Sequence, residues 1–257
     1  MAQLTKVNGA AYSITHGLTK LNGTVYTIEA GKTKIGGTIR DISFGPIPYN
    51  FQQVAYIQSK TNNGPYIVLP ITTQEGLKLE FECEQYAITG VTETCCLGYH
   101  ASNSRDQYFT GYRNSTALNH FYGQINIGSN QVSLTTQSLT SGTGSSVHMI
   151  ACRVDFGNYG TTNSASVQVG DEVGSTTRTS AISFGGSPMY LFAYTTGTQR
   201  AGTFGRITAY SASDAVIMDL YPVKRKSDSV PGFWDTISRQ FLINSGSGSF
   251  TAGPDVE

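Results

Sequence analysis

The chain has 257 residues, of which 39% are hydrophobic and only 13% are charged. Its 17 basic and 17 acidic residues cancel, so no excess of positive charge draws it to nucleic acid or to anionic lipid. No apolar run approaches the length of a membrane span, and the opening residues "MAQLTKVNGA" show no secretory signal. We therefore expect neither nucleic acid binding nor membrane insertion.

Three similar units of fourteen residues open the chain: "LTKVNGAAYSITHG" (4–17), "LTKLNGTVYTIEAG" (18–31) and "KTKIGGTIRDISFG" (32–45). Each unit carries Asn-Gly or Gly-Gly at the same place, and these dipeptides favour two-residue hairpin turns. In the first unit such a turn pairs Val7 with Ala10 and Thr5 with Tyr12. The repeats therefore predict a meander of about six short strands.

One face of this meander is expected to be apolar, because alternate residues of a strand share a face. The residues on that face are Val7, Tyr12, Ile14, Leu21, Tyr26, Ile28, Ile35 and Ile42. A sheet this small cannot bury such a face by itself, so it either folds back on its own chain or docks on other chains. We favour docking on other chains in a homo-oligomer, most simply a trimer, because short periodic units stack in a line and suit an anchor or fibre stem.

The repeat ends at "GPIPYN" (45–50), where two prolines in three residues predict a stiff, extended connector. We expect a domain boundary here. Residues 1–48 would form the hairpin anchor, and residues 49–257 would form a separate domain.

Longer strands are expected after this boundary. The segment "LKLEFECEQY" (77–86) alternates, which directs one set of side chains inward and the other outward. The inward set is Leu77, Leu79, Phe81 and Cys83, and the outward set is Lys78, Glu80, Glu82 and Glu84. About twelve such strands, with no sustained helical period, predict an antiparallel two-sheet sandwich.

The cysteines indicate a reducing compartment rather than a disulfide framework. There are four: Cys83, Cys95, Cys96 and Cys152. Adjacent Cys95 and Cys96 would point to opposite faces of a strand, which is unsuitable for a zinc site. We expect four free thiols and no metal.

The acidic strand allows two chemical interpretations. Glu80, Glu82 and Glu84 would be neighbours roughly 7 Å apart along one face, a spacing that could suit glycoside hydrolysis. The alternative, which we favour, is a solvated face whose carboxylates pair with Arg105, Arg113 or Arg153 on neighbouring strands. The four histidines, which show no metal-ligand spacing, are His16, His100, His120 and His148. We expect no enzyme activity and no cofactor.

Three stretches carry a resemblance to a known family: "VAYIQSKTNNGPYIVLPI", "GRITAYS" and "LYPVKRKSDSVPGFWDTISRQFLINSGSGSFTAGPDV". They resemble a concanavalin A-like (laminin-G-like) jelly-roll domain found in phage and prophage virion proteins of gut Firmicutes, whose N-terminal segments the fourteen-residue repeats also resemble. Two positions depart from that pattern, namely Ser229 and Arg239, where the family usually has glycine. Because arginine tolerates positive φ poorly, the last hairpin turn is expected to differ in type.

The resemblance implies an all-β jelly-roll virion protein, assembled in the host cytoplasm. Its repeats would contact other virion proteins, and its jelly roll would adhere to a host surface glycan as a fibre or receptor-binding component. The alternative is a purely structural capsid-decoration or tail-lattice protein that binds no sugar.

Aromatic faces and amide or carboxylate groups hold sugars, and the middle of the chain offers both. The expected glycan site comprises Tyr99, Tyr108, Tyr112, Tyr122, Asn103 and Asp106, with Asn114 and Asn158 at further strand ends. The other interpretation places these tyrosines in the core or on an ordinary sheet surface. At the end of the chain, "FWDTISRQFLI" predicts a closing hairpin that buries Phe233 with Phe241 or Trp234 with Leu242. "FTAGPDV" is then expected to run back along the sandwich.

Overall fold

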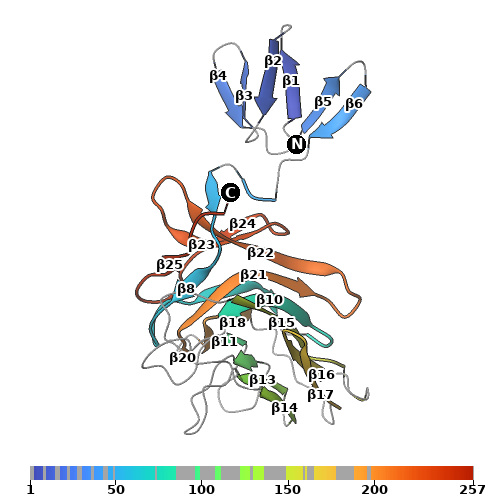
Figure 1. The fold of residues 1–257 in the computed structure, drawn as a ribbon, viewed down its shortest axis with the longest axis vertical. Helices are drawn as coiled ribbons and strands as arrows, with labels where there is room; N and C mark the ends of the chain where they lie inside the picture. The colour runs from blue at the N-terminus through green and yellow to red at the C-terminus, as the bar shows by residue number, and fades with distance from the viewer. Residues whose placement is uncertain are drawn as a thin grey trace.

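Two β-sheets form the body of the protein, as Figure 1 shows. The computed structural model describes residues 3–7, 10–14, 18–21, 24–27, 31–35, 38–42, 46–48, 50–72, 74–84, 96–98, 108–110, 122–127, 130–135, 149–158, 160, 165–177, 188–195 and 198–256. Strands are the only regular secondary structure in these ranges. The all-β prediction is therefore confirmed.

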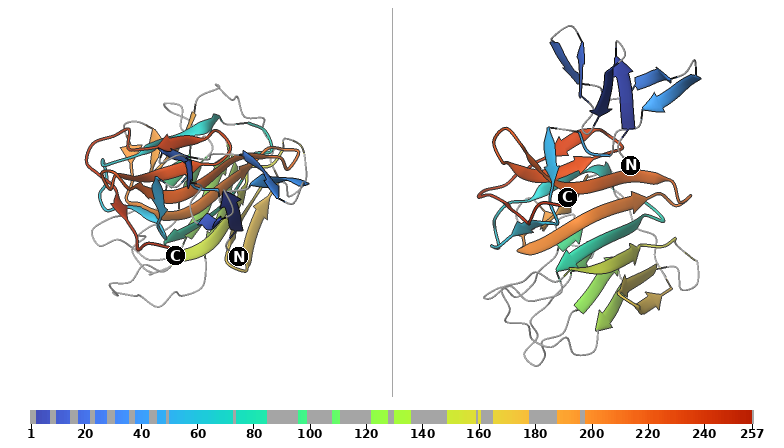
Figure 2. Two further views of the ribbon diagram at one scale, coloured as in Figure 1. Left: turned by 90° about the horizontal axis from the view of Figure 1, so that it is seen from above. Right: turned by 45° about the horizontal axis from the view of Figure 1, so that its top comes forward.

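The larger sheet has eleven strands. They are β7 (Phe51–Gln53), β8 (Ile57–Ser59), β10 (Lys78–Glu84), β15 (Met149–Asp155), β16 (Ala165–Val169), β17 (Glu172–Thr176), β21 (Gly202–Tyr210), β22 (Val216–Arg225), β23 (Pro231–Asp235), β24 (Gln240–Leu242) and β25 (Thr251–Ala252). The order along the sheet is β17-β16-β15-β10-β21-β22-β23-β24, with β7 beside β22, and β8 between β21 and β25. Figure 2 shows β10, β21 and β22 side by side across the middle of this sheet.

The smaller sheet has eight strands. They are β9 (Ile67–Thr72), β11 (Cys96–Gly98), β12 (Tyr108–Thr110), β13 (Tyr122–Ile127), β14 (Asn130–Thr135), β18 (Pro188–Leu191), β19 (Ala193–Thr195) and β20 (Thr198–Gln199). Pairing is antiparallel in both sheets except between β11 and β19, which are parallel. The two sheets form the predicted jelly-roll sandwich. The expected count of about twelve strands was too low, because several of the strands described are only two or three residues long.

The core lies between the two sheets and is rich in phenylalanine. Phe81 of β10 meets Phe109 of β12 with ring centroids 4.9 Å apart, which joins one sheet to the other. Phe192 and Phe204 make a second such contact at 5.1 Å. The predicted inward set of β10 is confirmed, since Leu77, Leu79, Phe81 and Cys83 are at most 3% exposed.

The prediction that Glu84 points outward was wrong, because its carboxylate is buried. Pairing of β10 with β21 shifts between Phe81, opposite Ile207, and Cys83, opposite Phe204, so β21 carries a bulge there. The Glu84 carboxylate accepts hydrogen bonds from Thr203 Oγ1 and from Gln58 Nε2, the latter at 3.3 Å. Burial of this charged group is thus matched by hydrogen bonds from neighbouring strands, which sequence alternation could not reveal.

Six short strands, drawn in blue in Figure 1, precede the sandwich in the sequence. They are β1 (Gln3–Val7), β2 (Ala10–Ile14), β3 (Leu18–Leu21), β4 (Thr24–Thr27), β5 (Gly31–Ile35) and β6 (Thr38–Ile42). β1 and β2 pair Val7 with Ala10 and Thr5 with Tyr12, the register expected from the Asn8-Gly9 turn. The continuous meander was wrong, since the described strands form three separate two-stranded sheets. Asn-Gly or Gly-Gly occurs within each unit but not at the links between units.

The predicted anchor face is described only in its backbone. Ile28 lies outside the described residues, and nothing is described of the side chains of the other seven members of the face. The connector is described at 46–48, where the carbonyl of Pro48 accepts a hydrogen bond from the Phe51 N–H at 3.0 Å. Docking on other chains and the domain boundary therefore stay predictions.

The closing hairpin near the C-terminus is present as β23 and β24, but both predicted buried pairings, Phe233 with Phe241 and Trp234 with Leu242, were wrong. Phe233 lies opposite Leu242, and Trp234 lies opposite Phe241. Phe233 is fully buried and Leu242 packs against the same core, which leaves Trp234 and Phe241 on the other face. The offset comes from a four-residue loop (236–239), since the ladder ends with Asp235 opposite Gln240.

The two positions where glycine was expected both retain a positive φ. Arg239 has a φ of 56° and Ser229 has a φ of 60°. In the last hairpin the Asp235 carboxylate accepts hydrogen bonds from the N–H groups of Ile237 and Ser238, at 3.2 and 3.1 Å. These bonds hold the loop in shape, so Arg239 adopts the left-handed conformation despite its side chain.

The last described residues run back along the sandwich, as predicted. β25 pairs with β8, and Val54 bridges to Asp255. The Ala55 N–H donates to the Pro254 carbonyl at 2.8 Å, and Phe250 is buried. This end of the chain is therefore part of the larger sheet. Within the described ranges, no helix has the length and apolar character needed to cross a membrane.

Candidate functional site

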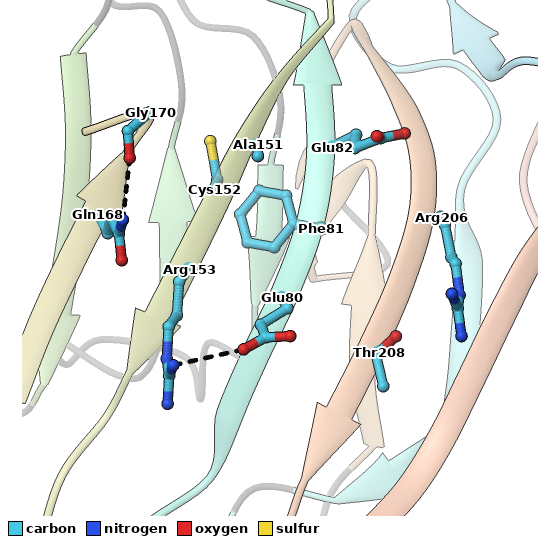
Figure 3. A pocket seen from close by; sticks show the side chains of 10 residues that line it. All are labelled: Glu80, Phe81, Glu82, Ala151, Cys152, Arg153, Gln168, Gly170, Arg206 and Thr208. Atoms are coloured by element: carbon cyan, nitrogen blue, oxygen red, sulfur yellow. Dashed lines mark hydrogen bonds and ion pairs between the residues drawn. The ribbon is translucent and has the colours of Figure 1, made fainter. Parts of the chain in front are cut away.

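An open groove of about 360 Å³ lies on the outer face of the larger sheet, away from the smaller sheet. Figure 3 shows its lining, which comes from four neighbouring strands and one turn. The residues are Glu80, Phe81, Glu82, Ala151, Cys152, Arg153, Gln168, Gly170, Arg206 and Thr208. Most of the side chains that reach the surface are charged or polar.

Strand register places the polar side chains in one row. Glu80 of β10 lies opposite Arg153 of β15 and Thr208 of β21, and Arg153 lies opposite Gln168 of β16. Their neighbours along each strand point into the core, so alternation brings the row to the outer face. Gly170, with a φ of 57°, starts the tight turn between β16 and β17 and accepts a hydrogen bond from Gln168 Nε2 at 2.9 Å.

Glu80 has two partners on the groove surface. Arg153 Nη1 lies 3.4 Å from Glu80 Oε1, and the Tyr210 hydroxyl donates to Glu80 Oε2 at 3.0 Å. The hydrogen bond to Glu80, and then burial, raise the pKa of Tyr210. Of the three arginines proposed as partners of the acidic strand, Arg153 is confirmed, while Arg105 and Arg113 lie outside the described residues.

Arg206 is held in place by Asp219 of the adjacent strand. Arg206 Nε and Nη2 donate to the two Asp219 oxygens at 2.9 and 3.0 Å, and these bonds raise the pKa of Arg206. The guanidinium carbon also lies 4.6 Å from the centroid of the Tyr221 ring. Thr208 Oγ1 donates to Asp219 at 3.2 Å, so this corner of the groove is rigid.

Glu82 is exposed and, unlike Glu80, has no partner among the side chains that the structure describes. None of those described side chains forms an ion pair or hydrogen bond with its carboxylate. Figure 3 shows Glu82 extending toward β21, where Gly205 makes room for it. A Cβ atom on Gly205 would lie 2.5 Å from Glu82 Oε2.

An aromatic cluster borders the groove on the side of Tyr221. Trp234, opposite Tyr221 in the ladder, lies 5.3 Å from the Phe51 ring centroid, and Phe51 lies 4.7 Å from that of Phe241. Phe51 is 7% exposed, whereas Trp234 and Phe241 are half-buried. The outer face therefore offers a polar groove next to partly accessible aromatic rings.

The structure leaves the predicted glycan residues largely untested. Tyr99, Tyr112, Asn103, Asp106 and Asn114 lie outside the described residues, as do all four histidines. Of Tyr108 and Tyr122 only the backbones are described, in β12 and β13 of the smaller sheet. Asn158 is exposed just after β15, at a strand end as predicted.

Several groove residues were missed in the sequence, although a signal for them existed. Arg206 and Thr208 alternate with Ile207 in "GRITAY", and Gln168 alternates with Val167 and Val169 in "SVQVG". That pattern assigns them to a polar face but does not say which strands lie beside β10. The strand order of the larger sheet shows that β15 and β21 lie on either side of β10 and that β16 lies beside β15.

In the part of the chain that the structure describes, no group of three or more His, Cys, Asp or Glu residues is arranged to hold a metal ion. The groove can instead offer hydrogen bonds and charge to a polar ligand. A glycosidase needs one carboxyl group held as an acid, usually in an apolar pocket. Glu80 and Glu82 lie on an open, hydrated surface.

No family model matches the sequence, and no curated protein matches it. Among solved structures, the chain is similar to domains LG4-5 of the mouse laminin α1 chain, with 11% sequence identity and a TM-score of 0.44. The match covers 82% of this chain and 48% of that one, so this chain corresponds to about half of the laminin fragment. The strand order and the contacts between the two sheets define the fold.

Proposed function

We propose that the protein is a glycan-adhesion component of a bacteriophage virion, and that the groove on the larger sheet is its sugar site. The observation that carries the sugar site is the groove itself, an open concavity whose floor and walls offer amide, hydroxyl, carboxylate and guanidinium groups. Sugars present many hydroxyl groups that can both donate and accept, and such a lining can match them.

The shape of the groove suits an extended chain rather than an enclosed small molecule. Its volume of about 360 Å³ is at the lower end for small-molecule sites, and it is open to solvent. A shallow polar site gives weak binding, because the sugar hydroxyls and the groove must both lose water. Several copies on one particle would compensate, and avidity can raise apparent affinity by a factor of about 10² or more.

The virion assignment is supported by the resemblance of the C-terminal block and of the fourteen-residue repeats to phage virion proteins. In this proposal residues 1–48 dock on other virion proteins or on sister chains, with a trimer as the simplest form. The jelly roll from residue 49 onward then faces the host surface. Assembly takes place in the cytoplasm of the infected cell.

A purely structural virion protein is the second candidate, and one observation favours it. Glu80 already pairs with Arg153, and Arg206 already pairs with Asp219, so much of the groove's charge is satisfied within the protein. In that case the groove would be an ordinary charged sheet surface in a capsid-decoration or tail-lattice protein.

Binding of the full chain to purified wall polysaccharide of the host tests the proposal. Gln168→Ala and Thr208→Ala should each weaken binding about three- to tenfold, the effect of losing one hydrogen bond. Tyr108→Ala and Tyr122→Ala test the site predicted on the smaller sheet. Glu172→Gln, on exposed β17 outside the groove, is the control and should bind like wild type.

The outcomes separate the candidates. Loss of binding in the groove variants with unchanged melting supports the groove, and loss only in the tyrosine variants moves the site to the smaller sheet. Absence of binding by the wild-type oligomer to any host glycan favours the structural candidate. Release of free sugar that disappears in Glu80→Gln or Glu82→Gln would show a hydrolase instead.

A further inference from the structure

We infer that the groove selects a glycan bearing a free, positively charged amine, with Glu82 as the residue that recognises it. This inference rests on the proposed glycan-binding function and specifies the class of sugar. It is carried by the distribution of charge in the groove, by the exposure of Glu82 and by the small residues around it.

The charges of the groove do not cancel once their partners are assigned. Glu80 is opposite in charge to Arg153 and lies 3.4 Å from it. Arg206 lies in the groove lining, but both of its short hydrogen bonds go to Asp219 outside the lining. Glu82 is then the carboxylate of the groove without a partner among the described side chains, and it leaves one net negative charge.

The surroundings of Glu82 leave room for a ligand rather than for a protein cation. The residue opposite it on β15 is Ala151, and the buried Gly205 lies beneath its carboxylate on β21. Gly170 lines the far side of the groove. None of these three residues carries a positive charge, and Arg206, next to Gly205, is bonded to Asp219, so a ligand cation can pair with Glu82 at this point.

An amino sugar matches this arrangement better than a neutral or an acidic sugar. Its ammonium group can donate hydrogen bonds to the Glu82 carboxylate, while hydroxyls of neighbouring sugars in the same chain meet Gln168 on β16 and Thr208 on β21. An N-acetylated sugar of the same ring has no charge and would leave Glu82 without a partner. A sugar acid would place a second negative charge beside Glu82.

Matched oligosaccharides test this inference with the full chain. The probes are the hexamer of glucosamine, which carries free amines, and the hexamer of N-acetylglucosamine, which has the same backbone without the charge. Wild type should bind the amine form at least threefold more tightly by titration calorimetry at low salt, a preference of the size expected for one exposed ion pair. The preference should shrink as salt is raised, because salt screens exposed charges.

Glu82→Gln keeps the shape of the side chain and removes its charge, so it should abolish the preference and leave binding of the N-acetylated form unchanged. Glu172→Gln, the exposed carboxylate on β17, should retain the preference. Equal binding of both hexamers by wild type, a preference unchanged in Glu82→Gln, or binding of neither hexamer would overturn the amine assignment. Failure of the glycan proposal is detected separately, by absence of wild-type binding to host wall polysaccharide.

Discussion

The sulfur atoms of Cys83 and Cys152 lie 3.5 Å apart on the adjacent strands β10 and β15, and no disulfide joins them. Both side chains are buried among core residues, at 0% and 4% exposure. We expect a thiol reagent such as DTNB to leave both unmodified in the native protein and to label both in denaturant, because reaction needs an accessible thiolate. Peptide mapping after alkylation measures this. A bridged Cys83–Cys152 peptide would contradict it.

Gly232 should not tolerate alanine. A Cβ atom there would lie 2.3 Å from the Leu242 carbonyl oxygen and 2.8 Å from the Phe241 ring, so the backbone of β24 would have to move. We expect Gly232→Ala to lower the free energy of unfolding by about 2–3 kcal/mol, as overpacking of a core does. Gly205→Ala is the comparison, and urea unfolding measures both.

At Gly205 the nearest obstacle is the end of the Glu82 side chain, which is exposed and can turn away. Gly205→Ala should therefore lower the free energy of unfolding by less than about 1 kcal/mol. Equal costs for the two alanine variants would contradict this account of the two glycines.

Asp235 should be essential to the closing hairpin. Its carboxylate is fully buried and accepts hydrogen bonds from the Asp219, Ile237 and Ser238 N–H groups at 3.0, 3.2 and 3.1 Å. Asp235→Ala leaves these donors without a partner and should cost about 2–4 kcal/mol. Asp235→Asn keeps one acceptor oxygen and should cost less. If thermal and urea unfolding show Asp235→Ala to be neutral, the hydrogen-bond network does not hold this loop.

The contribution of Asp155 to the free energy of unfolding should decrease as the pH rises, the opposite of the usual effect of a carboxylate. Burial is the main cause that raises the pKa of Asp155 above its ordinary 3.8, so the native state holds this proton more tightly than the unfolded chain does. Its contribution to stability is therefore present below pH 3.8 and is lost as the pH rises through the folded-state pKa. Asp155→Asn removes this titration. Its free energy of unfolding, measured relative to wild type, should therefore be higher at pH 7 than at pH 3.

Asp214→Asn is the matched control for this pH effect, with the opposite sign. The hydrogen bond from Lys78 lowers the pKa of Asp214, so its contribution is present above pH 3.8 and is lost as the pH falls through the folded-state pKa. The free energy of unfolding of Asp214→Asn, measured relative to wild type, should therefore be lower at pH 7 than at pH 3. Urea midpoints at the two pH values measure both variants, and the same sign for both would refute the assignment.

The hairpins formed by β1 to β6 should govern oligomeric state. We expect the full chain to be an oligomer, most simply a trimer, and a truncated chain starting at Tyr49 to be a monomer, because the repeats carry the predicted apolar face. Light scattering on both chains measures this. Two equally well-behaved monomers would show that the repeats do not join chains.

Local sequence patterns were enough to predict the longer strands of the sandwich but not several strands of two or three residues. Alternation in "LKLEFEC" placed Phe81 and Cys83 in the core, and Asn8-Gly9 set the register of the first hairpin. Such signals depend on neighbours within a few residues, and the chain carries them in full. Turn residues were harder to predict, because hydrogen bonds from the Ile237 and Ser238 N–H groups to Asp235 compensate for the absence of glycine at Arg239.

The groove could not be predicted, because it depends on which strands become neighbours. Glu80 meets Arg153 and Tyr210, which lie 73 and 130 residues further along the chain (153 − 80 and 210 − 80). The burial of Glu84 likewise depends on Thr203 and Gln58, which two other strands bring to it. Alternation along a strand indicates which face of the sheet a side chain occupies. The neighbours of that side chain depend on the order of the strands in the sheet.

In the proposed adhesion role, the position of β7 has a mechanical consequence. Tension applied through residues before Asn50 reaches the sandwich at β7, which is held by three residue pairs with β22. β22 in turn pairs with β21, the strand that carries Arg206 and Thr208 of the groove. Beside β7, Val54 bridges to Asp255, and the Val256 N–H donates to the Gln53 carbonyl. A pulling force would therefore load two backbone attachments together before it reached the proposed groove.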